Sequence, residues 1–143
     1  MESYQKFFHQ YFLLYRPFIS ELNNILNEYD LHYSQWSIMY YLERDESATL
    51  VQLAKHLYVE KPTITRTVHS LIKLDYIEQI PGKDQREKRI QLNTKGKDVT
   101  SKLRQEINEY EQKIMAGVSE EQQEEMIQLL AVVRNNIIKG EKN

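Results

Sequence analysis

The sequence predicts a mainly α-helical fold with a small β component, an α+β arrangement of several helices and one hairpin. Three observations predict it: apolar residues recur every three or four positions near both ends of the chain, a turn separates two short amphipathic segments in the middle, and two short β-branched stretches follow them. These patterns are typical of half-buried helices and of paired strands. With 143 residues, the chain is long enough for one domain with a buried core.

Residues 1–30 are expected to form the first helix. Pro17 lies inside it and is expected to kink the helix or split it near Arg16, because proline lacks a backbone N–H and crowds the preceding turn. The apolar side of this helix is broad and rich in aromatic residues. It consists of Phe8, Tyr11, Phe12, Tyr15, Phe18, Ile19, Leu22, Ile25, Leu26 and Tyr29.

A second helix is expected after a break in the pattern at residues 30–33. Ser34 is assigned as its N-cap, because a serine hydroxyl can accept a hydrogen bond from a backbone amide that is free at a helix start. A polar run over residues 43–47 ends this helix. Its apolar residues are Trp36, Met39, Tyr40 and Leu42.

Residues 50–73 are predicted to form a helix-turn-helix. Thr49 and Gln52 have capping-box spacing, in which each side chain bonds a backbone amide at the start of a helix. The turn at residues 58–61 leads to a second helix with Pro62 at its first position, where a missing N–H costs nothing. Asp75 is expected to follow this helix in the left-handed conformation, which aspartate tolerates. The apolar faces of the two helices contain Leu50, Leu53, Ala54 and Leu57, and then Ile64, Val68, Leu71 and Ile72.

Two strands, at residues 76–81 and 89–93, are expected to form a hairpin. The loop between them is charged and opens with a glycine, so we expect an exposed tip. Thr94 is assigned as the cap of a fifth helix, and the capping-box pair Ser119 and Gln122 begins a sixth. The apolar residues of these two helices are Val99, Leu103, Ile107, Tyr110 and Ile114, and then Met126, Leu129, Leu130, Val133 and Ile137.

Basic residues are concentrated in the middle of the chain, although the net charge is only −2. Residues 55–104 contain 12 basic and 6 acidic side chains, whereas residues 1–54 contain 3 and 7, and residues 105–143 contain 4 and 8. A basic centre between acidic ends indicates that one face meets a polyanion. Because the chain has no cysteine, disulfides, thiolate metal sites and cysteine nucleophiles are excluded.

The second helix of the predicted helix-turn-helix has the residue types that suit the major groove of duplex DNA. Arg66 is expected to contact bases, because a guanidinium can bond O6 and N7 of guanine together, and Thr65 and His69 lie beside it. Phosphate contacts position a protein without reading sequence, and they are assigned here to Lys61, Thr63, Ser70 and Lys73, with Pro62 in the same segment. The alternative interpretation is an ordinary solvated helix face.

The predicted hairpin tip suits the minor groove. The negative potential of a narrow minor groove attracts inserted arginine side chains. The tip region contains four basic residues, Lys83, Arg86, Lys88 and Arg89. Asp84 is expected to accept a charge-assisted hydrogen bond that holds the loop or Arg86 in one geometry. A basic solvated turn is the alternative.

Two motifs carry a family resemblance. The run Asp84-Gln85-Arg86-Glu87-Lys88-Arg89, followed by Leu92-Asn93-Thr94-Lys95-Gly96, resembles the wing signature of the MarR (multiple antibiotic resistance regulator) family, in which Asp-x-Arg-Asp/Glu-Arg/Lys-Arg precedes Leu-Thr-x-x-Gly. Asn93, between Leu92 and Thr94, is a small departure from it. The segment Val59-Glu60-Lys61-Pro62-Thr63-Ile64-Thr65-Arg66 resembles the entrance of the family's recognition helix. The length and helix order agree over essentially the whole chain.

The resemblance implies a homodimer that binds a pseudo-palindromic operator through two winged helix-turn-helix lobes and usually represses transcription. It makes Arg86 the minor-groove arginine and Asp84 its partner. The whole chain, residues 1–143, then forms one MarR-type domain, with the DNA-binding lobe at 34–94 and dimerisation helices at 1–30 and 95–143. Within the lobe, the helix-turn-helix covers about 50–73 and the wing about 76–93. The segments at the two ends also lie too far apart in the chain to serve one small central core, so we expect them to pack on each other and on a second copy.

Members of this family often lose DNA affinity when a small aromatic or phenolic compound fills a cleft between the dimerisation and DNA-binding parts. The candidates to line such a cleft here are Tyr15, Arg16, His32, Tyr33, Trp36 and Tyr40. The alternative is that these residues form ordinary core, because aromatic residues at helical spacing usually pack.

No catalytic motif is present, so an enzyme, a cofactor and a metal site are not expected. The sequence lacks a nucleophile elbow with a Ser-His-Asp order, a glycine-rich phosphate loop and paired histidine ligands. The main alternative is a winged-helix module that binds a protein, which would need an apolar recognition face. An enzyme with a site among the tyrosines lacks a supporting acid/base pair. No apolar run approaches the ~20 residues of a membrane span and no export signal is recognised, so a cytoplasmic location is expected.

Overall fold

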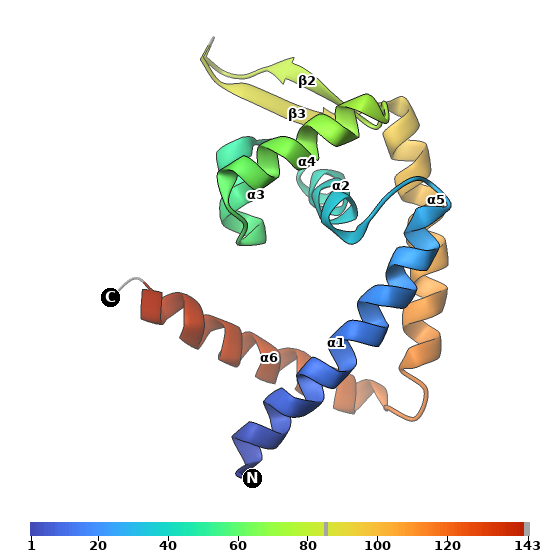
Figure 1. Cartoon of the computed structure of the whole chain (residues 1–143), viewed down its shortest axis with the longest axis vertical. Coiled ribbons are helices and arrows are strands. Elements are labelled where there is room, and N and C mark those ends of the chain that lie inside the picture. The colour runs from blue at the N-terminus through green and yellow to red at the C-terminus, as the bar shows by residue number, and fades with distance from the viewer. Residues whose placement is uncertain (85, 142–143) are drawn as a thin grey trace. The chain divides into compact units, whose positions relative to one another are not determined.

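The structure is a computed structural model that describes residues 1–84 and 86–141 (Figure 1). The described part contains the helices α1 (Ser3–Asn27), α2 (Tyr33–Asp45), α3 (Leu50–Leu57), α4 (Lys61–Lys73), α5 (Thr94–Ile114) and α6 (Glu120–Glu141), and the strands β1 (Ser47–Thr49), β2 (Ile77–Pro81) and β3 (Lys88–Leu92). This order confirms the predicted layout of helices and hairpin. Gln85, in the predicted tip, and residues 142 and 143, in the predicted C-terminal helical region, lie outside the described residues.

The chain divides into two compact units at Asn108. The first contains α1 to α4, the sheet and most of α5, and the second contains the end of α5 and the helix α6. None of the helices in the described ranges combines the length and apolar character needed to cross a membrane.

The core of the first unit is built from one face of each of its helices and from the sheet. Many of the apolar positions predicted from helical spacing are buried, which confirms the predicted faces of α2, α4 and α5 and of the second half of α1. The fully buried side chains include Leu26, Leu31, Ile38, Met39, Leu42, Leu53, Ile64, Leu71 and Leu103.

The sheet is antiparallel, with strand order β1-β3-β2. The hairpin is in the expected place: Ile77 lies opposite Leu92, and Pro81 opposite Lys88. Strand β1 was not expected, because three residues are too few to display an alternating pattern. Ser47 lies opposite Gln91 and Thr49 opposite Arg89, so β1 ties the hairpin to the residues that begin α3.

Two predicted helix caps are wrong because the helices begin earlier than expected. His32 is the N-cap of α2, and its amide donates to Gln35 Oε1 at 2.9 Å, so Ser34 lies inside the first turn. At the start of α5, Asn93 Oδ1 accepts from the Gly96 amide at 2.7 Å, so Asn93 replaces Thr94 as the cap. Asparagine, serine and threonine all cap helices, so residue type alone does not separate neighbouring candidates.

Helix α1 runs unbroken through Pro17, so the predicted split near Arg16 does not occur. Proline removes one backbone hydrogen bond, and a helix of 25 residues retains the others. The two halves differ in environment: Leu22 and Leu26 are buried, whereas Phe12 is 66% exposed. The N-terminal half therefore presents an aromatic surface.

Helix α6, in the second unit, also presents apolar side chains to solvent. Its start is as predicted, since the Ser119 and Gln122 capping box has bonds of 3.0 and 3.1 Å. Seven of its larger apolar residues are between 40% and 59% exposed: Met126, Ile127, Leu129, Leu130, Val132, Ile137 and Ile138. A helix with such a face is stabilised by an apolar partner.

The hydroxyl of Tyr76 joins the end of the helix-turn-helix to the end of α1. It donates to the Tyr29 carbonyl oxygen at 2.8 Å, and its ring is buried. This burial is the main cause that raises the pKa of Tyr76 above 10.0, with smaller contributions from Asp30 and Tyr29. The folded state therefore favours the protonated phenol.

We expect Tyr76→Phe to lower the free energy of unfolding by about 1 kcal/mol at pH 7, because the Tyr29 carbonyl loses its partner. A raised folded-state pKa contributes stability below the unfolded value of 10.0 and loses it as the pH rises further. The difference between wild type and variant should consequently shrink above about pH 10. Urea unfolding at pH 7 and pH 10.5 measures both effects. Equal stability at pH 7 would contradict the role of this hydrogen bond.

Candidate nucleic-acid interface

The interface is centred on α4, which has the two faces predicted for it. Ile64, Val68 and Leu71 are buried against the lobe. The opposite face is exposed and mostly basic, and it contains Lys61, Pro62, Arg66, His69 and Lys73. Lys61 rather than Pro62 is the first helical residue, so the proline lies one position later than predicted. A helix that docks on a protein typically does so through an apolar face, and this face is not apolar.

Local hydrogen bonds hold the turn between α3 and α4. The capping box of α3 is confirmed, with the Thr49 amide 3.0 Å from Gln52 Oε1 and the Gln52 amide 3.1 Å from Thr49 Oγ1. At the other end of α3, Tyr58 adopts the left-handed conformation with φ 58°, and the Val59 amide donates to the Ala54 carbonyl at 3.0 Å. Asp75, after α4, has φ 62°, as predicted.

The threonines of α4 bond within the helix. Thr65 Oγ1 donates to the Lys61 carbonyl at 3.0 Å, and Thr67 Oγ1 donates to the Thr63 carbonyl at 2.9 Å. Thr63 Oγ1 accepts from Arg66 Nη2 at 3.3 Å. This contact directs the Arg66 guanidinium towards the N-terminal end of α4, which is the end that approaches base edges in helix-turn-helix proteins.

Ser70 lies on the inner side of α4, although its residue type and place in the sequence predicted a phosphate contact. Its hydroxyl accepts from Gln35 Nε2 at 2.9 Å and donates to the Thr67 carbonyl at 2.6 Å. Gln35 is itself buried and caps α2 through the His32 amide. The hydroxyl of Ser70 therefore links α4 to α2 within the lobe.

At the wing tip, Lys83, Asp84, Arg86 and Lys88 are exposed. The expectation that Asp84 holds the loop is confirmed: its Oδ1 accepts from the Arg86 backbone amide at 3.4 Å, and its carbonyl accepts from the Glu87 amide at 2.9 Å. The Gly82 amide donates to the Glu87 carbonyl at 2.9 Å, and a Cβ added at residue 82 would overlap the Glu87 backbone. Glycine is therefore needed where the two ends of the tip approach each other.

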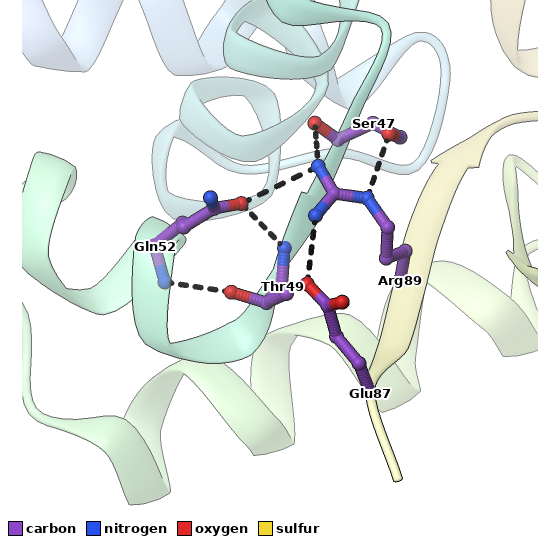
Figure 2. Close-up of polar contacts among 5 residues, drawn as sticks. All are labelled: Ser47, Thr49, Gln52, Glu87 and Arg89. Atoms are coloured by element: carbon purple, nitrogen blue, oxygen red, sulfur yellow. Dashed lines mark hydrogen bonds and ion pairs between the residues drawn. The ribbon is translucent and has the colours of Figure 1, made fainter. Parts of the chain in front are cut away.

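Arg89 differs from the other basic residues of the wing. Its side chain is 22% exposed, and it turns towards β1 and the start of α3 (Figure 2). Its partners Ser47, Gln52 and Glu87 were not recognised from the sequence. Glu87 is two residues from Arg89 in the sequence, so this contact is local. The contact with Ser47 depends on strand β1, which the sequence did not predict.

The residues predicted to line an effector cleft come from α1 and α2 or lie between them, and they have different environments. Partial burial of the Tyr33 side chain, and then the nearby Tyr15 and Tyr11, raise the pKa of Tyr33. Trp36 is 5% exposed and belongs to the core, with its ring centroid 6.2 Å from that of Tyr40. Tyr15, Arg16, His32, Tyr33 and Tyr40 are exposed.

A cavity of about 490 Å³ lies elsewhere in the first unit. None of the six predicted effector residues lines it. Its lining residues belong to the end of α2, β3 and the start of α5, with Glu46 just after α2, and they are Leu42, Glu43, Glu46, Gln91, Leu92, Lys97 and Thr100.

An amphipathic helix after a tight turn, with a basic antiparallel wing beside it, defines a winged helix-turn-helix protein, a class that binds DNA. A sequence model of the MarR family matches residues 29–87. An uncharacterized HTH-type transcriptional regulator of Staphylococcus aureus strain Mu50 is 26% identical over 142 residues, which are 97% of each chain. The chain is therefore similar to the MarR family of transcriptional regulators, as its motifs predicted.

Solved structures share the fold of this chain. Staphylococcus aureus MarR in complex with salicylate and kanamycin superimposes with a TM-score of 0.85 at 26% identity, covering 94% of this chain and 92% of that one. A mutant of Escherichia coli MarR complexed with operator DNA shares the fold, with a TM-score of 0.80, 19% identity and coverage of 93% and 99%. The named relatives are transcriptional regulators, and both solved structures share the fold of this chain.

Proposed function

We propose that the chain is a cytoplasmic repressor that binds a pseudo-palindromic operator as a homodimer, with residues 34–94 as its DNA-binding lobe. The observation that carries the proposal is the pairing of two exposed basic surfaces on one lobe. One is the outer face of α4, with Arg66, His69 and Lys73, and the other is the wing tip, with Lys83, Arg86 and Lys88. The Escherichia coli relative bound to operator DNA supports the same class of ligand.

The two surfaces suit the two grooves of a duplex. Helix α4 fits the major groove, where Arg66 reads a guanine and Thr65 and His69 lie near neighbouring bases. Arg86, at a narrow tip held by Asp84, fits the minor groove. Sequence-independent phosphate contacts are assigned to the basic and small polar residues around them, which are Lys61, Thr63, Lys73, Lys83 and Lys88, with Pro62 in the same segment.

The proposed dimer is built from the helices at the chain ends, residues 1–30 and 95–143. The aromatic first half of α1 and the apolar residues of α6 are exposed in a single chain, and a second copy is a partner of matching chemistry. A two-fold dimer places two α4 helices one DNA turn apart, about 34 Å, on a pseudo-palindromic site.

We also propose that a small phenolic compound weakens DNA binding. Three exposed tyrosines, Tyr15, Tyr33 and Tyr40, offer aromatic surface. Arg16, next to Tyr15, adds a cation, and His32, next to Tyr33, adds a hydrogen-bonding imidazole. Such a set suits an aromatic acid. Staphylococcus aureus MarR, with 26% identity, has been solved with salicylate bound.

Fluorescence anisotropy tests the proposal, with a labelled duplex from the chain's own upstream region, a scrambled duplex as control and a series of salt concentrations. We expect preferential binding at a dimer stoichiometry, with log K falling linearly with log salt by about 0.9 per phosphate contact. Salicylate should lower the anisotropy of the specific complex. Equal binding to both duplexes would contradict sequence-specific recognition, and absence of binding at low salt would favour the protein-interaction alternative.

A further inference from the structure

We infer that Arg89 is a positioning residue that anchors the wing to the first helix of the helix-turn-helix, and that it does not contact DNA. The inference rests on the proposed function, because the wing must contact DNA for its position to matter. It also revises the role that the sequence motif suggested for this arginine.

The guanidinium of Arg89 is held from three directions (Figure 2). Nε donates to Ser47 Oγ at 3.0 Å, and Nη2 donates to the Ser47 carbonyl at 3.1 Å. Nη1 pairs with Glu87 Oε1 at 3.1 Å, and Nη2 also lies 3.5 Å from Gln52 Oε1. All three guanidinium nitrogens therefore have acceptors within the protein, and bidentate binding to a phosphate would require breaking these bonds.

These acceptors belong to the frame of the DNA-binding lobe. Ser47 is in β1, and Gln52 Oε1 also accepts from the Thr49 amide in the capping box of α3. Arg89 thus joins β3 to the start of the helix-turn-helix through one side chain. The backbone pairing of Arg89 with Thr49 reinforces the same junction.

The contacts of Arg89 lie where they can fix the position of the wing tip. Arg89 lies on β3 between β1 and β2, whereas the tip extends beyond the sheet (Figure 1). Arg86 lies three residues before Arg89, just outside the start of β3. Without this anchor, the tip can therefore swing about the last paired residues and move Arg86 out of the minor groove, while α4 keeps its place.

The charge distribution separates Arg89 from its neighbour Lys88. Glu87 offsets the charge of Arg89 inside the lobe, and the side chains of the pair are 22% and 34% exposed. Lys88 is exposed and adjacent in sequence, which makes it a matched control for a phosphate contact. A phosphate contact depends mainly on charge, whereas an anchor depends on the planar fork of arginine.

The test is a double-mutant cycle with the labelled upstream duplex, using Arg86→Ala, Arg89→Lys and the double variant. We expect Arg86→Ala to weaken binding by about tenfold. Arg89→Lys keeps the charge but loses the fork, so it should weaken binding by a similar factor in the wild-type background and by less than about twofold in the Arg86→Ala background. In the Arg86→Ala background, Arg89→Lys should leave the salt slope unchanged, whereas Lys88→Ala should reduce it by about 1.

Two further measurements separate positioning from unfolding. Circular dichroism and thermal unfolding should show a folded lobe for Arg89→Lys, and guanine N7 protection in the major groove should persist while minor-groove protection by the wing is lost. Ser47→Ala removes one acceptor from the other side and should give a smaller effect of the same kind.

The cycle distinguishes failure of this inference from failure of the proposed function. Wild-type affinity for Arg89→Lys, or equal losses for Arg89→Lys in both backgrounds, would overturn the anchoring role alone. If Arg86→Ala binds as wild type does, the wing contact itself is wrong, and the anchoring role fails with it.

Discussion

Replacing Arg66 with alanine is expected to weaken binding to the specific duplex by about 5- to 150-fold, while binding to the scrambled duplex changes little. Arg66 is exposed on α4, and its contact with Thr63 directs the guanidinium towards the end of the helix that meets base edges. A bidentate arginine contact discriminates guanine from other bases, so its loss should remove specificity first. Anisotropy titrations of both duplexes measure the affinity ratio directly.

Lys73→Ala is the matched control, because Lys73 lies on the same exposed face at the other end of α4. As a phosphate contact, it should weaken binding to both duplexes by the same factor and reduce the salt slope by about 1. If Arg66→Ala behaved in this way instead, Arg66 would be a phosphate contact and the base reading would lie elsewhere on the helix.

Gly96→Ala is expected to lower the free energy of unfolding by about 3 kcal/mol, the largest stability effect among these variants. A Cβ at residue 96 would overlap the Tyr76 carbonyl oxygen and lie 2.9 Å from the Tyr76 carbonyl carbon. The same oxygen accepts from the Asn93 amide at 3.1 Å, so it has little freedom to move. Urea unfolding monitored by circular dichroism measures the change.

Gly140→Ala is the control for this substitution, because a Cβ there meets nothing within 4 Å and the residue is helical. It should leave stability unchanged or raise it by up to about 1 kcal/mol, since alanine favours helix more than glycine does. Stability of Gly96→Ala equal to wild type would show that the start of α5 can shift away from Tyr76. The glycine of the wing signature would then need another explanation.

Gly96 and Gly140 differ in the space around them, and this difference explains why the motif includes a glycine at residue 96. The resemblance placed a glycine three residues after Asn93 without giving a reason for it. In the structure, Gly96 lets the first turn of α5 approach the backbone that follows α4, and its amide binds the Asn93 side chain. The family pattern marked Gly96 as part of the motif, and the close packing of α5 against Tyr76 explains why that residue is a glycine.

The sequence by itself determined the helical segments, their buried faces and several of their ends. The apolar spacing of α4, the capping boxes at Thr49 and Ser119 and the left-handed Asp75 all follow from residues a few positions apart. Within such short separations, helix geometry decides which groups meet, so residue type and spacing suffice. The exposed basic residues of α4 and of the wing tip belong to the same category.

Only the tertiary structure decided which polar side chains face inward. Arg89 and Ser47 are 42 residues apart, and Ser70 and Gln35 are 35 apart, so each pair meets only when the lobe is folded. Strand β1 likewise exists because β3 offers it a partner. The residue type of an arginine on the wing or a serine on the recognition helix does not show whether its side chain faces DNA or the protein. The difference lies in long-range contacts, which a one-dimensional pattern does not contain.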